Sequence, residues 1–315
     1  MKVTMKEVAE KLKTAKKILV TAHIHSDGDA LGSTLAMWQA LRQLGKDAQV
    51  YIDDELPANL AFLPHFDAIK RPAKDEKFDA DLLLVLDTSI DRIGNIRKMT
   101  DAPLLNVDHH VTNNNYTNDL YLDSDAAAAC EIVLDILHEL DVKITPDIAT
   151  CIYTGLATDT GFFNYSSTTA KTFRAAAELV ECGAKPNFVA EQTEKRTLND
   201  LKVMTAALQT VEIYFDGKVA GMFIDEELEK IVDTTEGLVD LIRVIDTVDV
   251  AFLLRWQDEN TSRASLRSKG TNVSDIVKKL GGGGHIRAAG CTLHMSFEDA
   301  KNTIIKALSE NFAKA

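Results

Sequence analysis

The stretch 21–33, Thr-Ala-His-Ile-His-Ser-Asp-Gly-Asp-Ala-Leu-Gly-Ser, concentrates side chains that can bind a metal ion or a phosphate. Its spacing is His-x-His-x-Asp-x-Asp, and His23, Asp27 and Asp29 share one short loop, so their side chains can converge at little cost in chain entropy. One Asp before a helix is commonly only an N-cap, and either His could be a solvated loop residue. Four ionisable groups exceed what a cap needs, so the pattern favours a metal site.

Similar side chains follow two other apolar runs. Asp87 closes the run Leu-Leu-Leu-Val-Leu, and Asp108, His109 and His110 come directly after Pro-Leu-Leu-Asn-Val. Continuous apolar runs are typical of central parallel strands, whose carboxyl ends meet at the edge of the sheet where ligands bind. Asp159 lies near the end of an apolar helix, where an unpaired buried carboxylate would be costly. We therefore expect all these groups to meet the first cluster.

The elements that must position these residues can be predicted from hydrophobic periodicity. A β-branched apolar run precedes the first cluster, and apolar residues at helical spacing follow it, so the cluster is the turn between a strand and a helix. The alternation continues, which predicts an α/β fold with a parallel sheet and a metal site at the carboxyl ends of its strands. The expected strands are 18–20, 48–52, 82–86 and 103–107, and the expected helices are 4–15, 30–44, 126–140 and 168–182. A further helix is expected to begin at 146 and to run through 152 into the stretch 154–163.

The pattern turns polar between 185 and 197, and a connecting helix is predicted over 198–210. We place the domain boundary here, which gives a metal-binding domain at 1–185, a connector at 186–209 and a second domain at 210–315. The second domain alternates strand-like runs with helices, which predicts a smaller α+β domain. Its expected strands are 211–215, 219–224, 250–256 and 262–267.

Composition restricts the function. The 315 residues suffice for two domains, and a hydrophobic content of 45% with 26% charged residues is typical of a globular protein. No apolar run reaches the length of a membrane helix and no signal-peptide pattern is present, so we expect a cytoplasmic protein without a membrane partner. The four Cys are widely spaced, so any metal must rest on His and carboxylate ligands. The net charge of −13 argues against tight binding of long nucleic acid.

The charge is uneven, however. Residues 255–287 hold seven Lys or Arg against three Asp or Glu. Within them, four consecutive Gly at 281–284 precede His285, and Arg267 lies upstream. A Gly run alone is usually a flexible turn, but it also lets backbone N–H groups approach phosphate oxygens. Beside these basic side chains, the phosphate-binding interpretation is favoured, and it suits a short anionic ligand.

The ordered set of motifs resembles the DHH/DHHA1 phosphoesterase superfamily over nearly the whole chain. The compact two-domain length and the pairing of Ser265-Leu-Arg-Ser268 with Gly-Gly-Gly-Gly-His are similar to its nano-RNase (oligoribonuclease) and pAp phosphatase group. That group hydrolyses short oligonucleotides and 3′-phosphoadenosine 5′-phosphate. The resemblance therefore implies a hydrolase of phosphate ester bonds that acts on short single-stranded oligonucleotides or nucleotides, with no long duplex as partner. A homodimer is left open.

The resemblance also implies two divalent ions, usually Mn²⁺ with Mg²⁺ as the alternative, and a set of roles for residues that match the pattern. His23, Asp27 and Asp87 would hold the first ion, and Asp29, Asp87, His109 and Asp159 the second. His110 would face the substrate phosphate, and Asp108 would orient the pair of His as a second catalytic residue. The second domain would bind substrate through Arg267, Gly283, Gly284 and His285. A ligand set of oxygen and nitrogen without thiolate suits Mn²⁺ or Mg²⁺ independently of the resemblance.

Four other functions compete with this prediction. A phosphodiesterase of cyclic or linear dinucleotides (c-di-AMP, pApA) is the nearest, and the sequence does not separate it. A manganese-dependent inorganic pyrophosphatase would share the first domain's motifs but lacks the Gly-Gly-Gly-Gly-His loop. A processive single-strand exonuclease would need further binding domains and a broader basic surface. A nucleotide-binding module without turnover is disfavoured because no ligand of the pattern is missing.

Overall fold

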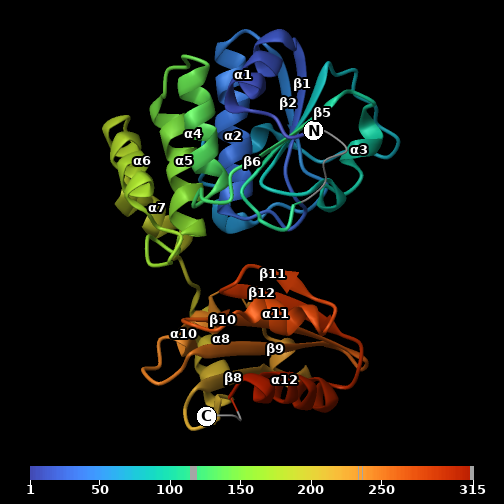
Figure 1. The fold of residues 1–315 in the computed structure, drawn as a ribbon, viewed down its shortest axis with the longest axis vertical. Coiled ribbons are helices and arrows are strands. Elements are labelled where there is room, and N and C mark those ends of the chain that lie inside the picture. The colour runs from blue at the N-terminus through green and yellow to red at the C-terminus, as the bar shows by residue number, and fades with distance from the viewer. Residues whose placement is uncertain (114–118, 233, 236, 313–315) are drawn as a thin grey trace. The chain divides into compact units, whose positions relative to one another are not determined.

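The computed structural model describes residues 1–113, 119–232, 234–235 and 237–312 (Figure 1). The chain divides into two compact units, which we call the N-terminal unit, Met1–Lys195, and the C-terminal unit, Arg196–Ala315. The division falls within the stretch 186–209 that the sequence presents as a connector. The bounds predicted for the two domains stay a prediction.

The N-terminal unit is built on a sheet of six strands in the order β3-β2-β1-β4-β5-β6, and every adjacent pair is parallel. The strand order reverses between β1 and β4, and in open parallel sheets ligands bind outside the carboxyl ends at such a switch point. The predicted parallel α/β sheet is therefore confirmed. The strands are β1 (Lys17–Thr21), β2 (Asp47–Tyr51), β3 (Ile69–Lys70), β4 (Leu82–Leu86), β5 (Leu104–Asp108) and β6 (Asp119–Leu122).

Helices cover both faces of this sheet because alternate strand residues point to opposite sides. On β1, Ile18 and Val20 join the larger core with the long helices, whereas Leu19 joins a smaller core with α3 (Ile96–Met99). The 3-10 helices are η1 (Ala58–Leu60), η2 (Phe66–Ala68) and η3 (Ile90–Arg92). The other helices of the unit are α1 (Met5–Thr14), α2 (Gly28–Gln43), α4 (Ala129–Glu139), α5 (Pro146–Asp159), α6 (Ala170–Glu181) and α7 (Pro186–Thr193).

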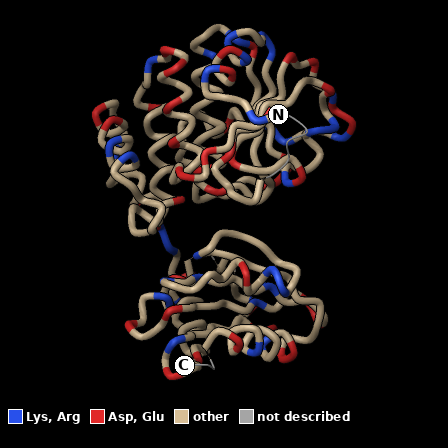
Figure 2. Tube along the Cα trace, in the orientation of Figure 1, with Lys and Arg blue, Asp and Glu red and all other residues tan. Residues whose placement is uncertain are grey.

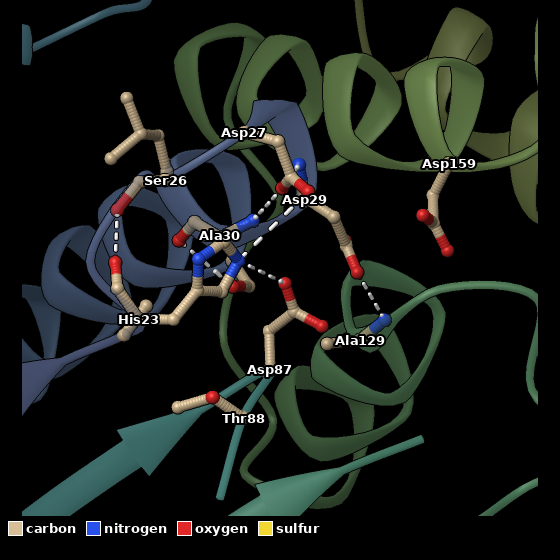
Figure 3. Close-up of polar contacts among 12 residues, drawn as sticks. His23, Ser26, Asp27, Asp29, Ala30, Asp87, Thr88, Ala129 and Asp159 are labelled. Carbon is tan, nitrogen blue, oxygen red and sulfur yellow. Dashed lines mark hydrogen bonds and ion pairs between the residues drawn. The ribbon is translucent and has the colours of Figure 1, made fainter. Parts of the chain in front are cut away.

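Helices α2 and α5 pack closely because glycines line their contact. A Cβ built on Gly32 would lie 2.4 Å from the carbonyl oxygen of Cys151, and one built on Gly155 would lie 2.8 Å from Oδ1 of Asp29. A larger residue at either position would force the helices apart. The close approach brings Asp29, at the start of α2, near Asp159, at the end of α5 (Figure 3).

Most of the elements expected in the N-terminal unit are present, with shifted ends. Helix α2 begins at Gly28, two residues earlier than predicted, because Asp27 caps it. Sequence reasoning missed β3, β6, α3, α7 and the 3-10 helices. Helix α7 lies in the polar stretch and has one fully buried side chain, Val189, so its amphipathic pattern is weak. The proline at its first position was an available signal.

The C-terminal unit is a second six-stranded sheet in the order β11-β12-β10-β9-β8-β7. Strands β8 and β9 pair in parallel and the other neighbours are antiparallel, so the predicted α+β class is confirmed. The strands are β7 (Glu212–Tyr214), β8 (Val219–Ile224), β9 (Val250–Asp258), β10 (Thr261–Ser268), β11 (Gly283–Gly284) and β12 (Ala288–Leu293). The helices are α8 (Leu198–Gln209), α9 (Glu226–Glu229), α10 (Leu238–Arg243), α11 (Val273–Lys278) and α12 (Phe297–Phe312).

Within the described part of the chain, no helix combines the length and the apolar character needed to cross a membrane. Acidic and basic side chains occur in both units (Figure 2).

Candidate metal centre

The side chains predicted to bind metal converge at the carboxyl ends of β1, β4 and β5 and on two helix ends. In Figure 3 the side chains of His23, Asp27 and Asp87 point toward one another, and Asp29 and Asp159 lie beside them. Their nitrogen and oxygen atoms form three groups, and the ligand atoms of each group lie within 4.8 Å of one another. The first group is His23, Asp27 and Asp87, the second is Asp29, His109 and Asp159, and the third is Asp87, His109 and His110.

Asp87 lies between the first two groups. It follows β4 with a φ of 58°, a left-handed conformation that Asp tolerates better than most residues. Its Oδ2 lies 3.4 Å from Nε2 of His23, and its Oδ1 lies 3.3 Å from Nε2 of His109. The side chain is buried, and Oδ1 accepts no hydrogen bond from the residues that the structure describes. One carboxylate therefore offers one oxygen to each group.

The loop between β1 and α2 fixes the first group. Oδ1 of Asp27 accepts the N–H groups of Asp29 at 3.1 Å and Ala30 at 3.0 Å, so Asp27 is also the N-cap of α2. Its Oδ2 remains 3.9 Å from Nε2 of His23. His25 turns the other way, since its backbone N–H and Nδ1 both contact Oδ2 of Asp54, at 2.8 and 2.9 Å. The cap and the ligand interpretations of Asp27 are thus compatible.

The start of α4 holds Asp29. Oδ2 of Asp29 accepts the N–H of Ala129 at 2.6 Å, and Oδ1 accepts the N–H of Cys130 at 2.8 Å (Figure 3). These N–H groups belong to the first turn of a helix, where partial positive charge favours a carboxylate. Oδ2 of Asp29 also lies 3.9 Å from Nε2 of His109, and Oδ2 of Asp159 lies 3.6 Å from the same nitrogen.

All three histidines of the centre turn Nδ1 toward an oxygen. Nδ1 of His23 is 2.8 Å from the Ile24 carbonyl oxygen, Nδ1 of His109 is 3.3 Å from that of Ala126, and Nδ1 of His110 is 2.7 Å from Oδ1 of Asp108. A ring that donates from Nδ1 carries its lone pair on Nε2. In their neutral form, the imidazoles of His23 and His109 are therefore oriented to present Nε2 as a metal ligand.

The buried side-chain amides of Asn106 and Asn113 form hydrogen bonds that hold Asp108 in place. Nδ2 of Asn113 donates to Oδ2 of Asp108 at 2.6 Å and to Oδ1 of Asn106 at 2.7 Å, and Nδ2 of Asn106 donates to the Thr88 carbonyl at 2.8 Å. Sequence reasoning missed both asparagines. The only available signal was a polar Asn106 inside an apolar strand, where an unpaired amide would be costly.

The charges of the centre shift the pKa values of its residues. Burial alone would lower the pKa of His23 and His109, but the contact with Asp87 and the nearby carboxylates raise it to about 9 and about 11. Burial raises the pKa of Asp87, but His109 and His23 outweigh burial and hold it below its usual range. Burial and the charge of Asp87 raise the pKa of Asp29 to about 7. The pKa of Asp159 is also raised, by burial and by Asp29.

This donor set fits divalent cations. Four carboxylates crowd around imidazole nitrogens, and a buried oxygen of the central carboxylate has no hydrogen-bond donor among the described residues. Such an arrangement is costly without positive charge beside it. Because the ligand atoms are nitrogen and oxygen without thiolate, the set suits Mn²⁺ or Mg²⁺. The assignment of individual residues to particular ions stays a prediction.

The residues predicted to bind substrate lie in the C-terminal unit. Arg267 is half-buried on β10 and pairs with Ala288 of β12, and its Nη1 donates to the Leu266 carbonyl at 3.1 Å. His285 lies in the tight turn between β11 and β12, where its N–H donates to the Ala288 carbonyl at 2.7 Å. Arg287, in the same turn, has a buried Nη1 with no hydrogen-bond partner among the described residues. Arg287 lies outside the predicted set of substrate-binding residues.

The chain itself requires most of the four glycines. Gly281 has a φ of +77°, Gly284 has a φ of +137°, and a Cβ on Gly282 would lie 2.3 Å from the Gly290 carbonyl oxygen. A Cβ on Gly283, in contrast, would meet no described atom within 4 Å. Backbone conformation and strand contact therefore account for most of the glycines in this run. At Gly283 neither applies, so a bound ligand is the remaining reason for the missing side chain.

Models of two families match the chain. The DHH family, N-terminal domain, matches residues 17–156, and the DHHA1 domain matches residues 216–314. A protein of Thermus thermophilus named bifunctional oligoribonuclease and PAP phosphatase NrnA is 33% identical over 314 residues, which cover 99% of this chain and 95% of that protein. The chain belongs to the DHH family. Membership confirms the resemblance inferred from the sequence and the prediction of a hydrolase acting on phosphate esters.

A second relative and a solved structure are also similar to this chain along most of its length. A Bacillus subtilis protein of the same name is 26% identical over 289 residues, covering 90% of this chain and 91% of that protein. The crystal structure of an exopolyphosphatase-related protein from Bacteroides fragilis superposes with a TM-score of 0.88 at 23% identity, covering 98% of this chain and 96% of that one. The architecture of both units is therefore shared along the whole length.

Proposed function

We propose that this DHH-family chain hydrolyses short oligoribonucleotides and 3′-phosphoadenosine 5′-phosphate with two divalent ions, Mn²⁺ in preference to Mg²⁺. The names of the Thermus thermophilus and Bacillus subtilis relatives support both substrate classes, since their similarity extends over at least nine-tenths of either chain. The donor set suits both Mn²⁺ and Mg²⁺, and the proposed preference for Mn²⁺ rests on the family resemblance.

The observation that carries the two-ion proposal is the position of Asp87. Its two oxygens face different ligand groups, with His23 on one side and His109 on the other. A carboxylate that serves a single ion would not need both oxygens flanked by imidazole nitrogens. Two bound divalent ions would activate water and neutralise charge on the phosphoryl group.

The protein's own residues orient and balance this chemistry. The oxygens that face the Nδ1 atoms of His23 and His109 fix the direction of the two rings, so no reorientation is needed when ligands bind. His110 donates Nδ1–H to Asp108, which leaves Nε2 for the substrate. When His110 is protonated, Nε2 donates a hydrogen bond to a phosphate oxygen, and the Asp108 carboxylate stabilises the imidazolium. Asn113 in turn holds Asp108.

The C-terminal unit would bind the part of the substrate remote from the scissile bond. Arg267 offers a planar guanidinium, which binds phosphate through two donors, and the His285 side chain and the Gly283–Gly284 backbone would make further contacts. Arg287 adds a buried nitrogen, Nη1, that has no hydrogen-bond acceptor among the described residues. Because the chain as a whole carries a net charge of −13, binding is restricted to substrates short enough to contact only this local basic region.

A substrate screen tests the proposal. Purified protein with Mn²⁺ should cleave RNA oligomers of about two to five nucleotides fastest and release phosphate from 3′-phosphoadenosine 5′-phosphate, since long strands meet the repulsion of an acidic chain. The measurement is product formation on oligomers of increasing length, with pApA and pyrophosphate included. Equal or faster degradation of a long single strand would favour a processive exonuclease. Activity confined to pyrophosphate would contradict the nucleotide-hydrolase proposal.

Replacing Arg267 by Ala should lower kcat/KM on a dinucleotide about ten- to hundred-fold, because a charge-assisted hydrogen bond contributes roughly 1.5–3 kcal/mol. A small chromogenic phosphodiester that needs only the metal centre should be hydrolysed almost as well as by the parent. Arg263→Ala is the matched control, since Arg263 is exposed on the same strand. If Arg267→Ala impaired both substrates equally with metal content and folding intact, the two units would not divide the work as proposed.

A further inference from the structure

Glu131 is a buried carboxylate outside the predicted ligand set. It lies in the first turn of α4 and is 2% exposed. Its Oε2 accepts the N–H of Ala127 at 2.7 Å. Its Oε1 is also buried and accepts no hydrogen bond from the described residues. A buried carboxylate with one unsatisfied oxygen is costly, so its position needs an explanation.

The peptide group that Glu131 contacts also contacts a predicted metal ligand. The N–H of Ala127 and the carbonyl of Ala126 belong to one peptide unit, and Nδ1 of His109 lies 3.3 Å from that carbonyl oxygen. The carboxylate therefore acts on the imidazole through a single peptide group. At the far side of the ring, Nε2 of His109 faces Asp87 at 3.3 Å and Asp159 at 3.6 Å.

A helix cap alone does not account for the charge of Glu131. A Glu or a Gln at the third helical position can each reach back to a backbone N–H near the helix start. Gln would satisfy that N–H without placing a charge in the interior. Lys171 on α6 balances the negative charge of Glu131 only in part. Its Nζ lies 4.0 Å from Oε1 of Glu131 but 2.8 Å from Oδ2 of Asp135, which is therefore its nearer partner.

We propose that Glu131 is a positioning residue whose negative charge, acting through the Ala126–Ala127 peptide, holds His109 with Nδ1 protonated and strengthens Nε2 as a metal ligand. The charge polarises the peptide, so its carbonyl becomes a better acceptor, and a stronger hydrogen bond from Nδ1 makes Nε2 more basic. The start of α4 then supports two ligands of one group, because its N–H groups hold Asp29 as well. The inference rests on the proposed two-ion function.

The test is metal binding to Glu131→Gln, which keeps the acceptor and the size but removes the charge. Free Mn²⁺ is followed by electron paramagnetic resonance during titration of the metal-stripped full chain. The wild type should bind two ions. Glu131→Gln should bind one of them about 10- to 100-fold more weakly, as is typical when a partner of a ligating His is lost, and the other ion unchanged. Glu139→Gln, at an exposed position on the same helix, should match the wild type.

The outcomes separate this inference from the function on which it rests. Wild-type affinity at both sites of a folded Glu131→Gln would overturn the role of the charge. Equal weakening at both sites would overturn it too, because only the group that contains His109 should respond. Fewer than two ions on the wild type would overturn the two-ion proposal itself.

A measurement on the wild type tests the same inference without requiring that the Glu131→Gln variant folds. In the ¹⁵N-histidine NMR spectrum of the Mg²⁺-loaded protein, His109 should carry its proton on Nδ1 and coordinate through Nε2. A proton on Nε2 would contradict the proposed action of Glu131, whatever the variant does.

Discussion

Replacing Asp87 by Asn should abolish turnover and leave the protein unable to hold two ions at once. Each carboxylate oxygen of Asp87 faces a different ligand group, so loss of its charge affects both. We expect kcat/KM to fall by at least about 10³-fold, beyond the 10- to 100-fold typical of a residue that only supports a ligand. Asn is the better substitution because it tolerates the left-handed backbone that Asp87 adopts, whereas Ala would add strain.

The measurement is kcat/KM on a dinucleotide together with metal content per chain. Asp91→Asn, on an exposed residue of the following 3-10 helix, is the matched control and should retain activity. Wild-type turnover of Asp87→Asn with two ions bound would show that Asp87 does not bridge. Loss of turnover with both ions retained would show that Asp87 acts in the reaction and is not needed to hold the metal ions.

Removing the metal should eliminate activity and lower the thermal stability of the N-terminal unit. Without cations, imidazolium groups and the backbone N–H groups that contact Asp27 and Asp29 are what balances the four carboxylates of the centre among the described residues. Each ion present at about 100 times its dissociation constant would contribute roughly 2.7 kcal/mol of stability, which corresponds to about 5–10 °C in Tm per ion for a unit of this size. Excess EDTA followed by Mn²⁺ should abolish and then restore both activity and Tm.

The increase in Tm that bound metal ions give the N-terminal unit should be larger at pH 8 than at pH 6. The pKa of His23 is raised from 6.5 to about 9, so the stability its proton provides is complete below pH 6.5 and is lost as the pH rises toward 9. The pKa of Asp29 is raised from 3.8 to about 7, so the metal-free protein also loses stability as Asp29 ionises. Metal binding needs these protons removed, so affinity rises with pH.

Differential scanning fluorimetry at both pH values, with EDTA or with Mn²⁺, measures this difference in Tm. A difference that shrinks toward pH 8 would mean that the raised pKa values do not govern the centre. Full activity in excess EDTA would exclude the two-ion mechanism.

The sequence alone predicted most of the centre because its signals are local. A buried parallel strand is a short apolar run, and a polar group just beyond it must lie at the carboxyl edge of the sheet. His23, Asp87 and His109 could therefore be expected on one edge without knowing the order of the strands. The family resemblance followed from the same motifs, and the α/β and α+β classes followed from periodicity.

The roles of single atoms required the tertiary structure. The resemblance implied a place for Asp87 in both ligand sets, but the physical basis is the strand order β1-β4-β5, which puts Asp87 between His23 and His109, and no local pattern encodes that order. The contact of Asp29 with the first turn of α4 joins residues 100 positions apart. The sequence favoured a phosphate-binding role for the glycines at 281–284, whereas the structure shows that backbone conformation and strand contact require most of them.

The role proposed for the Glu131 carboxylate could likewise not be predicted from the sequence. In the sequence it is one acidic residue in an amphipathic helix, where the usual expectation is a solvated surface group. Its burial, its contact with the Ala126–Ala127 peptide and the approach of His109 to the other side of that peptide arise only when β5 and α4 pack together. Sequence pattern determines which residue types reach the sheet edge, and packing decides which hydrogen bonds orient them, because those bonds join segments distant along the chain.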